Sequence, residues 1–142
     1  MTIAAILEGK GHEVVTVTAD HSVAQALAVL ADRRIGAVPV MAEDGVAGVF
    51  SERDVILCLA REGAAALDRS VGEVMTAPAV TVVPTDGVLA AMALMTRRRI
   101  RHLPVIDGAR LTGLVSIGDL VKYRIDRVEA DATAMRDYIQ QA

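Results

Sequence analysis

Hydrophobic residues along this chain follow two different spacings, and each spacing predicts one type of secondary structure. Short runs of β-branched and other apolar residues at 13–17 and 79–83 are typical of strands. Each run precedes a segment, 23–30 or 88–95, whose apolar residues recur at i, i+3, i+4 and i+7, and this period predicts an amphipathic helix. Strands and helices in this order indicate a mixed α/β (α+β) fold.

The same series of elements occurs twice because the chain is an internal duplication. An offset of 65 residues aligns 16–55 with 81–120 without a gap, and thirteen of the 40 aligned positions are identical, where unrelated sequences would share about three. Each copy continues with two further strands and a second helix, which begins at Ser51 or Ser116. The further strands are predicted at 37–41 and 46–50, and at 102–106 and 111–115. Each copy is therefore a β-α-β-β-α repeat, and two repeats are expected to pack together with a cleft between them.

Composition limits the classes of protein to which the chain can belong. It is 53% hydrophobic, with a net charge of −3 and only three aromatic residues, which favours a folded core and disfavours nucleic-acid binding. A single cysteine, Cys58, excludes an internal disulfide, and it is expected to be a buried helix residue. No signal peptide, membrane span, metal-ligand spacing or catalytic motif is evident. We therefore expect a cytoplasmic protein that is not an enzyme and does not bind membranes.

Each repeat contains glycine, two apolar residues, serine, two further residues and aspartate, written "GVFSERD" and "GLVSIGD". Ser51 with Asp54, and Ser116 with Asp119, predict capping boxes at two helix starts. The same helix starts offer free N–H groups and a carboxylate, which could accept hydrogen bonds from the two hydroxyls of a ribose. On that interpretation, the glycine lets the strand approach a ligand closely. The motif alone leaves both interpretations, capping and ligand binding, open.

Two further motifs accompany S-x-x-D, and together they carry a resemblance to a known family. Each repeat has a strand of the type hydrophobic-x-hydrophobic-Pro-Val, in "IGAVPV" and "IRHLPV", and "EVMT" (73–76) precedes the second repeat. The chain resembles a tandem pair of CBS (cystathionine β-synthase) domains over about residues 5–125. The resemblance implies two repeats packed about a pseudo-twofold axis. We divide the chain into a first CBS repeat at 8–65, a second at 66–125, and a C-terminal helix at 126–142 that could contact a second subunit.

The resemblance also implies two clefts between the repeats, which in this family often hold AMP, ADP, ATP, S-adenosylmethionine or NAD-type ligands. The first cleft would contain Ser51, Arg53, Asp54, Ala79, Ile100, Arg101, His102 and Pro104. The second cleft would contain Ser116, Asp119, Val14, Ile35, Gly36, Ala37 and Pro39. In each cleft the aspartate would hold the ribose hydroxyls, and apolar residues from the other repeat would flank the adenine.

The two predicted clefts differ in charge. Arg101 and His102 stand where the first repeat has Gly36 and Ala37. Resemblance to the regulatory subunit of AMP-activated protein kinase implies that such a basic pair lies beside nucleotide phosphates. The neighbouring arginines 97 and 98 are more simply explained as a solvated helix end. We therefore expect a mononucleotide such as AMP to prefer the Asp54 cleft, whereas a dinucleotide such as NAD(H) could reach both.

After the second repeat, an apolar residue recurs every three or four positions, at Ile125, Val128, Ala132, Met135 and Ile139. This stripe predicts an amphipathic helix that either packs on its own domain or forms a seam between two subunits. Together these features predict a homodimeric regulatory sensor of cellular energy state that binds an adenine nucleotide and signals to a separate, unidentified protein. A structural homodimeric adaptor with vestigial clefts is the alternative.

Overall fold

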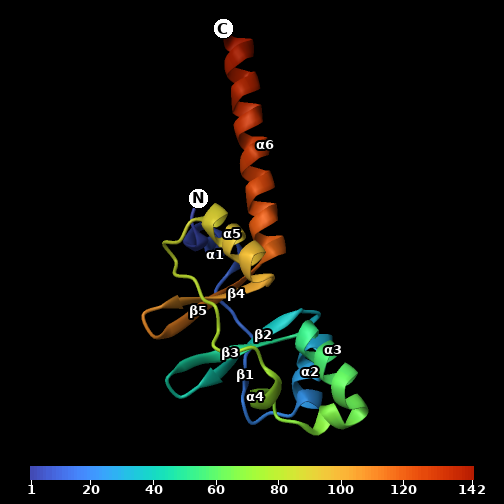
Figure 1. Ribbon diagram of the computed structural model, residues 1–142. Helices are drawn as coiled ribbons and strands as arrows, with labels where there is room; N and C mark the ends of the chain where they lie inside the picture. Colours follow the sequence, from blue (N-terminus) through green and yellow to red (C-terminus); the bar gives the residue numbers. More distant parts are fainter.

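A computed structural model describes residues 1–142 and has two small α/β units, from which one long helix extends (Figure 1). The elements in chain order are α1 (Ile3–Lys10), β1 (Val17–Thr18), α2 (Val23–Arg33), β2 (Ala37–Ala42), β3 (Gly45–Ser51), α3 (Glu52–Glu62), the 3-10 helix η1 (Gly63–Asp68), α4 (Val71–Val74), α5 (Val88–Arg98), β4 (His102–Asp107), β5 (Arg110–Ser116) and α6 (Ile117–Gln141). The mixed α/β fold and the duplication are thus confirmed.

The paired strands form two matching hairpins. Strands β2 and β3 are antiparallel from Ala37 opposite Ser51 to Ala42 opposite Gly45, and β4 and β5 repeat this register. Both hairpins contain a register shift at the same aligned position, which is evidence that the repeats share their geometry as well as their sequence. The four strands predicted for the hairpins are confirmed.

The strands predicted at 13–17 and 79–83 are mostly not formed. In the first repeat only β1 pairs, in parallel with β2 through Val17 and Val40. In the second repeat the equivalent segment makes one isolated bridge, between Val82 and Val105. A strand needs a partner along its length, and residues 79 and 80 line a cavity instead. β-Propensity alone therefore predicted too much strand here.

Helices α2 and α5 are confirmed, and each presents a small apolar face to its own core. Ser22 begins α2 with a reciprocal capping box to Gln25. Both helices end at an arginine in the left-handed conformation, Arg34 with φ of 53° and Arg99 with φ of 55°. This conformation normally favours glycine or asparagine, so each arginine carries some backbone strain.

The molecule has two hydrophobic cores, and each includes a segment that precedes the other repeat. Helix α1 comes before the first repeat, yet its Ile3 and Leu7 are fully buried in the core of the second repeat. The N–H of Ile3 also donates to the carbonyl oxygen of Asp86 at 2.9 Å. Helix α4 comes before the part of the second repeat that aligns with the first (81–120), yet its Val71 is buried in the core of the first. The two halves of the chain are therefore interlocked.

The motif glycines make room for these crossing segments. A Cβ atom on Gly48 would lie 2.6 Å from the carbonyl oxygen of Thr76, and one on Gly113 would lie 2.7 Å from Cδ2 of Leu7. Both distances are well below van der Waals contact. The expectation that these glycines admit a ligand is therefore wrong, because the space above each glycine is filled by the chain itself.

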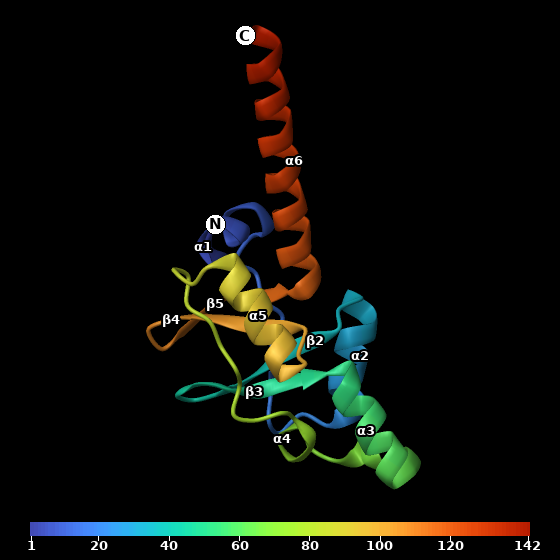
Figure 2. The same ribbon diagram turned by 45° about the horizontal axis from the view of Figure 1, so that its top comes forward.

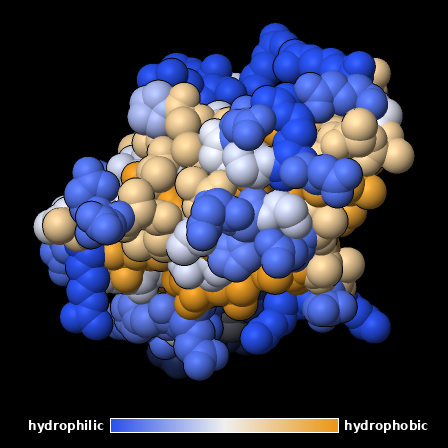
Figure 3. Space-filling view, turned by 90° about the horizontal axis from the view of Figure 1, so that it is seen from below, coloured by the Kyte–Doolittle hydropathy of each residue, from blue (hydrophilic) through white to orange (hydrophobic).

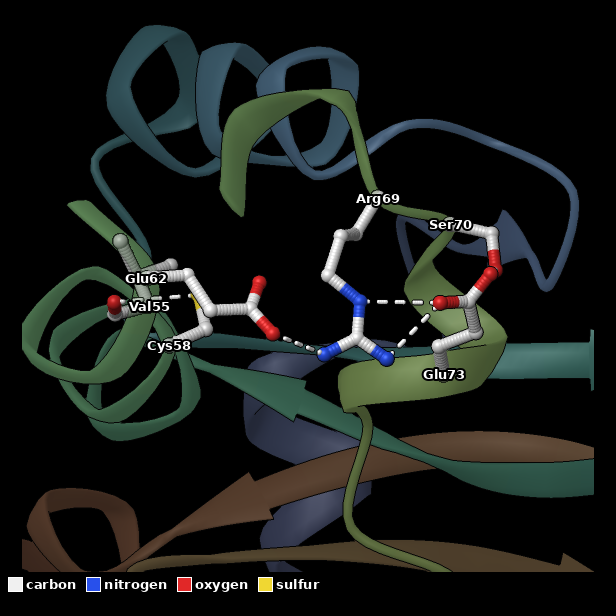
Figure 4. A network of polar contacts seen from close by, with 6 residues as sticks. All are labelled: Val55, Cys58, Glu62, Arg69, Ser70 and Glu73. Atoms are coloured by element: carbon white, nitrogen blue, oxygen red, sulfur yellow. Dashed lines mark hydrogen bonds and ion pairs between the residues drawn. The ribbon is translucent and has the colours of Figure 1, made fainter. Parts of the chain in front are cut away.

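Arg69 joins the end of α3 to α4 (Figure 4). Its guanidinium donates to Oε1 of Glu62 at 2.8 Å and to Oε2 of Glu73 at 2.9 Å. The hydrogen bond from Arg69 and a second one from Ser70 lower the pKa of Glu73. In the same region Cys58 is buried and its thiol donates to the carbonyl oxygen of Val55, as predicted for a structural cysteine.

Helix α6 begins inside the second repeat and then leaves the body (Figure 1 and Figure 2). Its stripe is uncovered, since Ile125, Val128, Met135 and Ile139 are 51%, 48%, 60% and 64% exposed. The alternative that the tail packs on its own domain is therefore wrong.

At the opposite end of the body, hydrophilic side chains interrupt the apolar surface (Figure 3). None of the helices combines the length and apolar character that crossing a membrane requires.

Candidate functional site

A cavity of about 550 Å³ lies between the two repeats. It brings together seven of the eight residues predicted for the first cleft: Ser51, Arg53, Asp54, Ala79, Ile100, Arg101 and His102. Pro104 does not line it. From the predicted second cleft, Gly36 and Ser116 line the same cavity, whereas Asp119, Val14, Ile35, Ala37 and Pro39 do not. The cavity therefore extends from Asp54 across to the second S-x-x-D motif.

Asp54 is a carboxylate buried at the wall of this cavity, with 8% of its surface exposed. Its Oδ2 accepts from the N–H of Ser51 at 2.9 Å and from the hydroxyl of Ser51 at 3.1 Å. Its Oδ1 accepts from the hydroxyl of Thr76 at 2.9 Å. The predicted capping box is therefore present. A carboxylate has about four acceptor positions, so one position on Oδ1 is left for a ligand hydroxyl.

Four arginines line the cavity: Arg53, Arg98, Arg99 and Arg101. The acidic lining residues are Glu52 and Asp54, so the lining carries two more positive than negative charges, four against two. Arg53 also spans the two repeats, because its Nη1 donates to the carbonyl oxygen of Arg99 at 2.6 Å. Guanidinium groups bind phosphate oxygens through paired hydrogen bonds. This lining is therefore suited to an anionic ligand.

Sequence reasoning missed two of these arginines. Arg98 was explained as part of a solvated helix end, and Arg99 was given no role. Both line the cavity, beside the left-handed turn at Arg99 that ends α5. Arg34, the residue that aligns with Arg99 in the first repeat, adopts the same left-handed conformation. An arginine in the sequence does not by itself predict this conformation, so no signal in the sequence indicated the position of Arg99. Thr76 was also missed, although it belongs to the "EVMT" motif.

His102 contributes a neutral ring to the site. Burial lowers its pKa below the usual value, and the positive charges of Arg101 and Lys10 lower it further. The ring lies against Gly36 of the other repeat, where an added Cβ atom would be 3.2 Å from Cε1 of His102 and 2.8 Å from Oε1 of Glu52. His102 therefore packs across the repeat interface, and at neutral pH the positive charge of the site comes from the arginines.

Asp119 has a cationic partner that Asp54 lacks. Its Oδ2 accepts from the N–H of Ser116 at 2.8 Å, so the second capping box is also present. The same oxygen accepts from Nζ of Lys10 at 2.6 Å, and Lys10 also donates to the carbonyl oxygen of Leu114 at 2.7 Å. Burial alone would raise the pKa of Asp119, but the hydrogen bonds and the charge of Lys10 outweigh it and leave that pKa lowered.

The two aspartates are thus held by equivalent parts of the chain with different chemistry. Lys10 ends α1, which precedes the first repeat, and Thr76 follows α4, which precedes the second. At the repeat offset of 65, Thr76 aligns with Gly11, one position after Lys10. Asp54 accepts a hydrogen bond from an uncharged hydroxyl, whereas Asp119 forms an ion pair with the ammonium group of Lys10. The structure contains no group of three or more His, Cys, Asp or Glu side chains that could hold a metal ion.

These features define a pair of interlocked repeats with a positively charged cavity between them. The family model of the CBS domain matches residues 11–61 and 71–126, and the chain belongs to this family. It is 32% identical over 148 aligned positions to the mitochondrial CBS domain-containing protein CBSX3 of Arabidopsis thaliana. That alignment covers 98% of this chain and 72% of the relative.

Solved structures show the same fold. A CBS-domain containing protein from Agrobacterium tumefaciens is 42% identical, with a TM-score of 0.84, over 87% of this chain and 99% of that chain. A CBS domain protein from Pyrobaculum aerophilum, solved in complex with AMP, is 27% identical, with a TM-score of 0.74, over 84% of this chain and 89% of that one. The chain is thus similar to CBS proteins that it matches over most of their length.

Proposed function

We propose that this protein is a regulatory module that binds an adenine nucleotide between its CBS repeats and signals its presence to another protein. The observation that carries the proposal is the cavity between the repeats, which combines a buried carboxylate, Asp54, with four arginines. The AMP complex of the Pyrobaculum aerophilum relative supports an adenine ligand. The ligand is bound and released unchanged, so the protein has no catalytic role.

Each part of a nucleotide has a chemical counterpart in the cavity. The free acceptor position on Oδ1 of Asp54 suits a ribose hydroxyl, since hydrogen bonds to a charged group contribute roughly 1.5–3 kcal/mol. Apolar lining residues at Leu57, Val80 and Ile100 suit the adenine ring. The arginines suit a phosphate. This charge favours AMP, ADP, ATP or NAD(H) over S-adenosylmethionine, which carries a sulfonium cation and no phosphate.

Signalling would use the contacts that join the two repeats across the cavity. The hydrogen bond from Arg53 to the carbonyl oxygen of Arg99 links α3 to the end of α5, and a phosphate would compete for the same guanidinium. A ligand can shift such an arrangement only by the difference of its affinities for the two states. We propose that the shift alters the relative position of the two repeats and that a partner protein detects the level of adenine nucleotide through this change.

The proposed compartment is the cytoplasm, on the basis of cysteine usage.

A second candidate function is a structural adaptor whose cavity binds no ligand. It is favoured by the capping boxes at Ser51 and Ser116, because capping alone gives both S-x-x-D motifs a role in the fold. The charge of the cavity has no explanation in that function.

Isothermal titration calorimetry with AMP, ATP, NADH and S-adenosylmethionine distinguishes the two functions. Wild-type protein is compared with Asp54→Ala and Asp119→Ala. Both variants lose the same type of capping box, so Asp119→Ala is the matched control for local destabilisation. Loss of one charge-assisted hydrogen bond predicts AMP binding about 10- to 150-fold weaker in Asp54→Ala, with little change in Asp119→Ala. Absence of binding by folded wild-type protein would establish the adaptor instead.

A further inference from the structure

The exposed part of α6 carries a longer apolar seam than the sequence pattern alone suggested. Val121, which is 38% exposed, precedes the stripe with the same spacing. The seam then comprises Val121, Ile125, Val128, Ala132, Met135 and Ile139, at alternate spacings of four and three residues. The CBS match ends at residue 126, so most of this seam lies outside the shared fold and needs an explanation of its own.

Alternate spacing of four and three is the heptad repeat of a coiled coil. Positions a are then Ile125, Ala132 and Ile139, and positions d are Val121, Val128 and Met135. Two of the three a positions are isoleucine, the type of residue that two-stranded parallel coils favour at a, and the leucine that such coils favour at d is replaced here by valine and methionine. A helix that leaves the body with six apolar side chains in one line gains little from its own domain, because most helix stability in proteins comes from packing of the apolar face.

We propose that α6 forms a parallel two-stranded coiled coil with α6 of a second copy of this chain, over residues 121–139. The flanking charges support this occupant and this orientation. In a parallel coil, position g of one helix faces position e of the next heptad in the other helix. That rule places Arg124 opposite Glu129 of the second copy, and Asp131 opposite Arg136 of the second copy. Both pairs are attractive, and the twofold symmetry of the dimer makes each of them twice.

Antiparallel arrangements fit the same residues less well. Full antiparallel overlap of the seam would place Glu129 opposite Glu129 and Asp131 opposite Asp131, and like charges at these positions select against an arrangement. An antiparallel overlap shifted by one heptad pairs Glu129 with Arg136 but leaves Val121 outside the coil. Of these arrangements, only the parallel one buries all six residues of the seam and also places opposite charges at both of its e and g pairs.

This proposal does not depend on ligand binding, and it also specifies geometry. Two bodies at the same end of a parallel coil lie side by side, whereas an antiparallel coil would place them at opposite ends. Partner orientation can therefore be measured directly by cross-linking.

Disulfide trapping of the full-length protein tests both the occupant and its orientation. Ile139→Cys puts a thiol at position a, where the two copies meet in a parallel coil, and Asp137→Cys puts one at the outward position f as the matched control. Under mild oxidation, Ile139→Cys should form a covalent dimer and Asp137→Cys should not. Cys58 is buried and common to both variants. Equal trapping of the two variants, or none in Ile139→Cys, would overturn the proposal.

Charge reversal gives a second, independent measurement. Glu129→Arg would face Arg124 of the second copy and should weaken the dimer at least tenfold by sedimentation equilibrium. Adding Arg124→Glu exchanges the pair and should restore the dissociation constant to within about threefold of wild type. Residues 129 and 137 are exposed and Arg124 is half-buried, where its Nη1 contacts Sδ of Met1 at 3.8 Å, so the melting temperature of the body is measured for each variant and should stay close to that of wild type. Failure of the exchange to restore dimerisation would contradict the parallel pairing.

Discussion

Lys10 offers a sharp test of why the two S-x-x-D motifs are not equivalent. Lys10→Met keeps the apolar stem of the side chain but removes the ammonium group that donates to Asp119 at 2.6 Å and to the carbonyl oxygen of Leu114 at 2.7 Å. Methionine is also the residue that the second repeat has at the aligned position, Met75. The substitution should therefore make the surroundings of Asp119 resemble those of Asp54.

The magnitude follows from the exposure of the pair. Lys10 and Asp119 are 38% and 26% exposed, so solvent screens the ion pair and its loss should cost about 0.2–1 kcal/mol of folding free energy. The fold should survive, with a melting temperature lower by at most about 5 °C. An acceptor on Asp119 freed for a ribose hydroxyl would add roughly 1.5–3 kcal/mol to binding there, about 10- to 150-fold in affinity.

Adenosine is the best probe for this effect, because removing Lys10 also removes a cation that a phosphate would use. Calorimetry should give one adenosine per chain in wild type and two in Lys10→Met, with Lys10→Arg as the control that keeps the cation and one site. Adding Asp119→Ala to Lys10→Met should abolish the second site. If Lys10→Met and wild type both bind one adenosine, Lys10 is not what prevents Asp119 from binding a ribose. The proposal for the Asp54 site would be unaffected by that result.

The pH dependence of stability checks the same contact without a ligand. Because the pKa of Asp119 is lowered in the folded state, the contact stabilises the protein above the unfolded pKa of aspartate, about 3.9, and this stability is lost as the pH falls through the folded value. Urea denaturation should therefore find wild type more stable than Lys10→Met at pH 7, with the difference shrinking below about pH 4. A difference that persists unchanged to pH 2.5 would mean that packing, rather than charge, accounts for it.

Two further predictions concern the backbone. Gly48→Ala should lower the free energy of unfolding by about 1–3 kcal/mol, because the added Cβ would lie 2.6 Å from the carbonyl oxygen of Thr76. Gly9→Ala is the control, since a Cβ there has no heavy atom within 4 Å. Equal stability of the two variants in urea denaturation would contradict the steric argument. Arg99→Gly and Arg34→Gly should each relieve a left-handed arginine and leave stability unchanged or higher. Only Arg99→Gly removes a cavity cation, so it alone should weaken AMP binding, by about 1.4-fold to fivefold for one exposed charge, as measured by calorimetry. Equal AMP affinities would exclude Arg99 from the site.

The duplication made much of the fold predictable. Hairpins and the helices α2 and α5 follow from apolar periods that are written twice, so each copy supports the interpretation of the other. The leading strands were overpredicted because β-branched residues at 79–83 match a strand in composition, while the ladder partner that a strand requires is present only at Val82. Periodicity describes one segment at a time, and pairing depends on two.

The candidate site was predictable only where its residues belong to a local motif. Asp54 and Ser51 lie three positions apart and could be recognised together. Lys10 contacts a carboxylate 109 residues away, and that contact depends on α1 crossing to the second repeat, which no local pattern encodes. Arg99 enters the cavity through a left-handed φ that arginine rarely adopts.

The crossing of α1 has a consequence for how the protein is made. Ile3 and Leu7 leave the ribosome well before their packing partners, such as Val88 and Leu120, are synthesised. The core of the second repeat therefore closes only after Leu120 has emerged, more than 110 residues after Leu7. A nascent chain halted after residue 65 would expose the apolar face of α1 and would be a substrate for chaperones, although its first repeat (8–65) is fully synthesised.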